Sequence, residues 1–179
     1  MKSLRSTHLA GVVVLGALLV AASAGAQAKG TAGAGQDQVA KRLETFDDLD
    51  FNVYTGQKWD EVKRSHAPDI IVHWPDGRTT KGLEKHIEDM KVMFTFAPDN
   101  RIRIHPVKFG SGDWTAVTGW LEGTFTKPMV LPNGKAIQPT GKAYRIPMAT
   151  IAHWNRNSVM DEEYLFWDNL TYMKQIGVM

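Results

Sequence analysis

The spacing of apolar residues changes from a helical period to a strand period near residue 100. Val39, Leu43 and Phe46 lie three or four positions apart, and either Leu49 or Asp50 continues the same stripe. This spacing is typical of a helix with one buried face. Similar spacing, ended by glycine or proline, predicts helices over three segments, namely Gln38 to Gly56, 59–66 and 83–94.

Residues that alternate between apolar and polar side chains dominate the second half of the chain, where turn signals divide them. Pro132-Asn133-Gly134-Lys135 is the strongest of these turn signals. Strands are predicted over 69–74, 101–105, 114–126, 143–154 and 159–167. Asp168 opens a terminal helix. Helices followed by strands in antiparallel order predict an α+β domain, with a curved sheet wrapped over helices.

The N-terminus has the features of an export signal in the usual order. Lys2 and Arg5 precede an apolar stretch over 9–22, and two Ala-x-Ala sites end at Ala26 and Ala28. This stretch is shorter than the ~20 residues of a membrane-spanning helix, which favours a cleaved signal over an uncleaved anchor. We therefore expect a periplasmic or secreted protein with no stable membrane insertion. Its parts are a signal peptide over 1–28, a flexible linker over 29–37 and a folded domain over 38–179.

Composition excludes several kinds of site. The 179 residues include no cysteine, which excludes disulfides, thiolate zinc sites, iron–sulfur clusters and a cysteine nucleophile. Without Lys2 and Arg5, the 21 basic residues fall to 19 and equal the 19 acidic residues. The sequence has no basic tract, so we expect no nucleic-acid partner. It also has no phosphate-binding loop, dinucleotide fingerprint or nucleophile elbow.

The last predicted strand carries the first candidate site. Counting back by two from Asp168 places Phe166, Tyr164 and Glu162 on one face. A carboxylate beside aromatic rings can have a shifted pKa and act as a general acid or base. The alternative is that Asp168 only caps the terminal helix. Trp120 would line an apolar cavity together with Tyr164 if their faces turn inward, although both residue types are ordinary core material too.

Two histidines are candidates for the same chemistry. His73 precedes a turn at the end of a predicted strand and His153 lies near the end of another. Either could act as a base or hold a ligand carbonyl. His66 and His86 fall among charged residues of predicted helices and His105 alternates with arginines, so we expect these three on the surface. Because the sequence has no H-E-x-x-H or H-x-H motif, we expect no metal and no cofactor. Cofactor-free acid/base chemistry or ligand binding remains.

Short motifs follow one another in a fixed order from Asp69 to the C-terminus. They are Asp69 through His73, Pro75-Asp76-Gly77 with Gly82-Leu83-Glu84, Ala97-Pro98-Asp99, Gly119 to Phe125, Pro139-Thr140-Gly141-Lys142, and Glu162-x-Tyr164-x-x-x-Asp168 followed by Gln175-Ile176-Gly177. This ordered set resembles the SnoaL-like polyketide cyclases, or ester cyclases, of the nuclear transport factor 2-like superfamily.

The resemblance implies a cone-shaped α+β barrel around a deep cavity, often as a homodimer or larger homo-oligomer. The family mechanism is a cofactor-free intramolecular aldol condensation, in which a strand-end aspartate removes a proton flanked by carbonyls. Asp168 matches that aspartate, and His73 and His153 are its expected partners. Tyr164 stands where the family usually has tryptophan. The expected substrate-binding residues are Tyr164, Trp120, Glu162 and Phe166.

Three classes of function stay open at this point. The first is a lyase, isomerase or cyclase acting on a small apolar carbonyl compound. The second is a non-catalytic protein that binds an apolar metabolite, and the third is a structural oligomer or envelope partner. A ligand-facing Asp168 near His73 or His153 would favour catalysis, because acid/base work needs hydrogen-bond reach. An Asp168 bonded only within its own helix would favour binding or structure.

Overall fold

The N-terminal part of the described chain is one long helix. The computed structural model describes residues 22–131 and 133–179, and the chain divides into two compact units, Met1–Ala34 and Gly35–Met179. Helix α1 runs from Ala22 to Asp48, so the predicted linker at 29–37 is helical. Extending an existing helix avoids the free-energy cost of nucleating a new one.

The predicted signal peptide lies largely outside the described residues, and its boundary stays a prediction. No described helix is long and apolar enough to cross a membrane.

The remaining elements follow the predicted order closely. A π-helical turn η1 (Leu49–Tyr54) and a 3-10 turn η2 (Trp59–Arg64) precede the sheet, and two further helices are α2 (Leu83–Phe96) and α3 (Asn169–Gln175). The strands are β1 (His66–His73), β2 (Thr79–Lys81), β3 (Arg101–Ile102), β4 (Lys108–Ser111), β5 (Trp114–Thr124), β6 (Met129–Val130), β7 (Ala136–Ile137), β8 (Ala143–Trp154) and β9 (Met160–Trp167).

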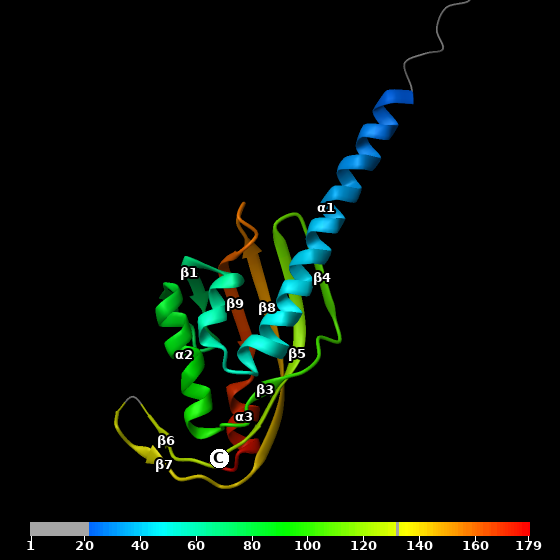
Figure 1. Ribbon diagram of the computed structural model, residues 1–179. Coiled ribbons are helices and arrows are strands. Elements are labelled where there is room, and N and C mark those ends of the chain that lie inside the picture. The colour runs from blue at the N-terminus through cyan, green and yellow to red at the C-terminus, as the bar shows by residue number, and fades with distance from the viewer. Residues whose placement is uncertain (1–21, 132) are drawn as a thin grey trace, which may run out of the picture. The chain divides into compact units, whose positions relative to one another are not determined.

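One curved sheet organises the unit Gly35–Met179. Its strand order is β2-β1-β9-β8-β5-β3, with β4 paired to β5 as well, while β6 and β7 pair separately. Strand β1 is parallel to β9, and the other neighbouring strands are antiparallel. Helix α2 and turn η1 lie over one side of the sheet (Figure 1). The predicted α+β fold, with helices packed on a curved and mostly antiparallel sheet, is confirmed.

The two sides of the sheet differ in burial, and we call them the inner face and the outer face. The inner face carries the buried side chains that belong to the core, among them Val117, Leu121, Ile146, Ala152 and Glu163. The outer face carries the alternate residues, among them Trp114, Trp120, Ile151, His153, Tyr164 and Phe166. The alternation itself is the ordinary two-residue period of a strand.

A β-bulge changes this period within β9. Asp161 is an extra residue, because the pairing of β9 with β8 shifts between His153 and Trp154. As a result Met160 before the bulge and Glu163 after it are both buried on the inner face. Simple counting by two would have placed these two residues on opposite faces.

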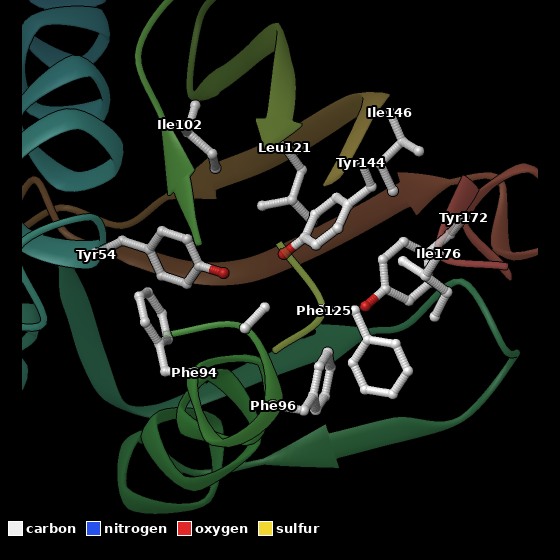
Figure 2. Packing of buried hydrophobic residues seen from close by; sticks show 11 residues of the cluster. Tyr54, Phe94, Phe96, Ile102, Leu121, Phe125, Tyr144, Ile146, Tyr172 and Ile176 are labelled. Carbon is white, nitrogen blue, oxygen red and sulfur yellow. The ribbon is translucent and has the colours of Figure 1, made fainter. Parts of the chain in front are cut away.

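Two buried tyrosines of the core, Tyr54 and Tyr144, are linked by hydrogen bonds through Asn100. Tyr144 Oη donates to Asn100 Oδ1 at 2.6 Å, and Asn100 Nδ2 donates to the hydroxyl of Tyr54. Figure 2 shows the two tyrosine rings directed toward each other, with Phe94 and Leu121 beside them. The polar atoms of this buried group are therefore satisfied by one another.

Candidate active site

Three buried polar side chains from three different elements converge on the inner face. His66 opens β1, His86 lies on α2, and Glu163 lies on β9. Glu163 Oε2 is 3.6 Å from His66 Nε2 and 3.3 Å from His86 Nε2, and each side chain is at most 4% exposed. We call these three residues the His–Glu–His cluster.

The predicted surface position of the two histidines is wrong, for local reasons. The 3-10 turn η2 ends at Arg64, so His66 begins a strand rather than ending a helix. His86 lies three residues after Leu83 and four before Met90, which is the apolar stripe of α2.

A second polar group, the Asp50–His105–Asp47 chain, connects the interior to the surface. His105 Nε2 is 2.8 Å from Asp50 Oδ2, and its Nδ1 is 2.8 Å from Asp47 Oδ1. At the outer end, Lys108 donates to Asp47. The His105 side chain is 1% exposed, so its predicted surface position is also wrong. Strand β3 ends at Ile102, and the segment that follows buries the ring between the two carboxylates.

Asp50 belongs to a short stretch of unusual helix. It lies in the π-helical turn η1, where the Thr55 amide donates to the Asp50 carbonyl at 3.3 Å. Such turns are rare and occur often at functional sites. The sequence held a signal for Asp50, because it shares the apolar stripe of the first predicted helix. Glu163 had a weaker signal, because counting by two places it on the same strand face as Leu165 and Trp167.

The two buried carboxyl groups have pKa values shifted in opposite directions. Burial raises the pKa of Asp50, and the hydrogen bond and charge of His105 only partly offset this effect. Burial also acts to raise the pKa of Glu163, but the neighbouring His66 and His86 outweigh it and hold that pKa below its usual value. Burial lowers the pKa of His86 to about 4. The two buried carboxyl groups therefore lie in different electrostatic surroundings.

The His–Glu–His cluster and Asp50 line one cavity on the inner face. The cavity has a volume of about 90 Å³, and its polar lining includes Asp50, Tyr54, Thr150 and the whole His–Glu–His cluster. Apolar residues complete the wall, among them Met90, Leu121, Leu165 and Trp167. The rings of Trp74 and Trp167 meet edge to face there, with centroids 6.3 Å apart. The arrangement places groups capable of proton transfer inside a largely apolar cavity.

Four of the residues predicted for the site lie on the outer face, where His73, Glu162 and Tyr164 form one group and His153 lies apart beside Asp161. His73 Nε2 is 2.9 Å from Glu162 Oε1, and the Tyr164 hydroxyl donates to the same oxygen at 2.8 Å. The rings of His73 and Tyr164 are stacked with centroids 4.1 Å apart. His153 Nδ1 is 2.6 Å from Asp161 Oδ1. These histidines are about one-third exposed, in contrast to those of the inner face.

The remaining predicted residues lie along a groove of about 590 Å³ that includes Trp120, Phe166 and Asp168. Asp168 accepts hydrogen bonds from the Leu170 amide at 2.8 Å and from the Thr171 hydroxyl at 2.5 Å. The Thr171 hydrogen bonds are the main reason that the pKa of Asp168 lies below its usual value. In the structure Asp168 therefore acts as the cap of α3. Its geometry matches the alternative that the sequence left open.

Solved structures place this arrangement in a known class of α+β proteins. A protein from Catenulispora acidiphila DSM 44928 with a ketosteroid isomerase-like fold, solved with trimethylamine, is 14% identical, with a TM-score of 0.60 over 78% of this chain and 94% of that one. A candidate SnoaL-like polyketide cyclase from Jannaschia sp. CCS1 is 21% identical, with a TM-score of 0.68 over 79% and 94%. IdmH from Streptomyces antibioticus, described as a candidate polyketide cyclase, is 20% identical, with a TM-score of 0.64 over 76% and 98%.

These likenesses establish the ketosteroid isomerase-like, or nuclear transport factor 2-like, fold. Residues 44–176 match the family described as SnoaL-like polyketide cyclase, and the chain belongs to this family. No curated protein matches the chain. The predicted family is therefore confirmed.

Proposed function

We propose that this protein is an exported acid/base catalyst that removes a proton next to a carbonyl group in a compact apolar substrate. The observation that carries the proposal is that two buried carboxyl groups from different elements, Asp50 and Glu163, line one cavity in different surroundings, with Asp50 hydrogen-bonded to His105. Paired groups of this kind mark acid/base assignments in many enzymes. Family membership supports the same type of reaction.

Asp50 is the proton carrier in this proposal. Its carboxylate takes a proton from the carbon beside the carbonyl, and the carbon–hydrogen electron pair becomes an enolate. The enolate then attacks a second carbonyl, which gives an aldol-type product, or takes a proton back at another position, which gives an isomer. His105 and Asp47 connect Asp50 to the surface and provide a route for exchanging that proton with solvent.

The cavity size supports a compact substrate. Its volume is about 90 Å³, less than the roughly 150 Å³ of an apolar cavity that takes up benzene. Small ketones and aldehydes fit this space. A multi-ring compound would need the wall at Trp74 and Trp167 to move.

Proton exchange on small ketones tests the proposal directly. The protein is incubated in D₂O with acetone, 2-butanone, cyclopentanone and 2,4-pentanedione, and loss of the hydrogens beside the carbonyl is followed by proton NMR. We expect acceleration for at least one ketone, and Asp50→Asn should lower it by about 10²–10⁴-fold, the usual contribution of a general base. Asp168→Asn is the matched control, since this change keeps the cap.

Other results would lead to different conclusions. If Asp168→Asn abolishes exchange and Asp50→Asn does not, the chemistry takes place in the outer groove, with Asp168, His73 and His153 as predicted from the sequence. If a ketone binds without any exchange, the protein is a carrier rather than a catalyst. Absence of both binding and exchange across the four ketones would contradict the proposal.

Export is supported by the positively charged start, the apolar stretch and the Ala-x-Ala sites within residues 1–28. Expression of the full chain in a bacterium with two membranes, followed by fractionation and intact-mass measurement, tests this part. We expect a periplasmic product that begins after Ala26 or Ala28. An uncleaved product in the cytoplasm would contradict export while leaving the proposed chemistry unaffected.

A further inference from the structure

The His–Glu–His cluster poses a problem that hydrogen bonds among its members do not solve. Glu163 Oε2 and His66 Nε2 are buried, and neither has a hydrogen-bond partner among the described residues. Their separation of 3.6 Å is too long for a hydrogen bond. Buried polar atoms without partners are uncommon in folded proteins and call for an explanation.

The surroundings of His66 fix which of its nitrogens is free. Its Nδ1 lies 3.2 Å from the carbonyl oxygen of Val62 and 2.9 Å from Ser65 Oγ, and the Ser65 hydroxyl donates to the same carbonyl at 3.0 Å. A carbonyl oxygen can only accept, so we assign the ring hydrogen to Nδ1. Nε2 then presents a bare lone pair to Glu163. Metal-bound histidines are commonly held in this way, by a carbonyl on the other ring nitrogen.

The distances within the cluster match a metal site. One ligand atom from each of His66, His86 and Glu163 can be chosen so that all lie within 4.8 Å of one another. Zinc binds nitrogen and oxygen at about 2.0–2.1 Å in tetrahedral geometry, which separates neighbouring ligand atoms by roughly 3.3 Å. The observed 3.3 Å and 3.6 Å from Glu163 Oε2 to the two histidines are close to that separation.

We propose that His66, His86 and Glu163 bind one divalent first-row transition-metal ion, with Zn²⁺ as its representative. Two imidazoles and one carboxylate suit such ions, whereas Ca²⁺ and Mg²⁺ prefer oxygen ligands. The three proposed ligands come from β1, α2 and β9, so they form no H-E-x-x-H or H-x-H motif in the sequence. The expectation of no metal therefore rested on contiguous motifs alone.

A metal ion bound by these three residues would have an open coordination position at the cavity. Three protein ligands leave a fourth position open for water or for a substrate oxygen, as in catalytic zinc sites. All three ligands line the cavity that Asp50 also lines. A carbonyl oxygen held at the metal would be polarised, which makes the neighbouring proton more acidic for Asp50. This proposal goes beyond the proposed function and is tested without any substrate.

Zinc titration of the purified protein, freed of metal with a chelator, is the decisive experiment. Isothermal titration calorimetry should show one Zn²⁺ per chain in the wild type. Glu163→Gln should weaken binding by about 100-fold or more, since changes to outer-shell partners alone cost 10–100-fold. Glu162→Gln is the matched control. This change is at the next residue, faces the outer side and removes the exposed His73–Glu162 pair, where zinc could bind adventitiously.

X-ray absorption of the zinc-loaded wild type gives a second measurement that needs no variant. It should report two imidazole nitrogens and oxygen neighbours at about 2.0–2.1 Å. If circular dichroism shows that Glu163→Gln does not fold, this spectrum decides the question. The proposal is overturned if the wild type shows no saturable site, if Glu162→Gln rather than Glu163→Gln removes binding, or if only one imidazole is bound.

Failure of this proposal is distinguishable from failure of the proposed function. Ketone exchange is measured both in the presence of chelator and with added Zn²⁺, whereas the titration uses the metal alone. A protein that exchanges ketone hydrogens but binds no zinc keeps Asp50 as a metal-independent base. A protein that binds zinc but exchanges no ketone keeps the metal site and loses the proposed reaction.

Discussion

The two faces of the neighbouring strands β1 and β9 carry the same pair of residue types in opposite surroundings. On the outer face His73 and Glu162 form a hydrogen bond of 2.9 Å, and both side chains are about one-third exposed. On the inner face His66 and Glu163 are 3.6 Å apart and almost completely buried. Exposed pairs of this kind are worth at most about 1 kcal/mol and have ordinary chemistry. The buried pair has the poorer geometry and the greater potential for function, because neither atom has a hydrogen-bond partner among the described residues.

The largest contrast in stability between the faces should come from two tryptophans. Trp154 is 1% exposed and donates to Thr115 Oγ1 at 2.8 Å, whereas Trp114 is 41% exposed. Trp154→Ala should lower the free energy of unfolding by about 3–5 kcal/mol. Trp114→Ala should cost less than about 1 kcal/mol. Urea unfolding of both variants checks this, and equal losses would mean that the two faces are wrongly assigned.

A smaller, pH-dependent effect should come from His105. Burial acts to lower the pKa of this ring, but the hydrogen bonds and charges of Asp50 and Asp47 outweigh burial and raise it. A raised pKa in the folded state stabilises the protein fully below the unfolded value of about 6.5, and the effect fades as pH rises through the folded value. His105→Asn should therefore cost about 2 kcal/mol near pH 6 and less at pH 9. A pH-independent difference would show that the ring is not charged in the native state.

The cap of α3 should give a local effect. Asp168→Ala removes the acceptor of the Leu170 amide and should speed hydrogen exchange at that amide about fivefold, whereas Asp168→Asn should leave it nearly unchanged. Amide exchange followed by NMR measures both variants. Equal protection in all three proteins would show that the cap does not form in solution.

The smallest change in folding stability is expected for the exposed apolar residues of the outer face. Ile151 and Phe166 are 38% and 49% exposed and lie on neighbouring strands. We propose that this face holds the homo-oligomer expected from the family resemblance, because apolar residues gathered on one surface often mark an interface. Phe166→Glu should shift sedimentation from dimer to monomer while changing the unfolding free energy by less than about 0.5 kcal/mol. A wild type that sediments as a monomer would refute this.

The order of elements and the family were available from the sequence, and the polar cavity of the inner face was not. Strand 143–154 was predicted with the bounds that β8 has, and the predicted helix over 83–94 differs from α2 by two residues at its end. Every residue predicted to be catalytic or substrate-binding nevertheless lies on the outer face, in its groove or at the cap of α3. Periodicity separates a strand into two faces but does not say which one turns toward the helices.

The sequence by itself determined the fold class, because turn residues, apolar periods and ordered motifs are local features that can be recognised in the sequence alone. Only the tertiary structure decided which polar residues meet. The parallel pairing of β1 with β9 brings His66 close to Glu163, the segment after β3 places His105 between the two carboxylates, and the apolar stripe of α2 brings His86 to β1. These encounters join residues up to about a hundred positions apart, and contacts of that kind leave no period in the sequence.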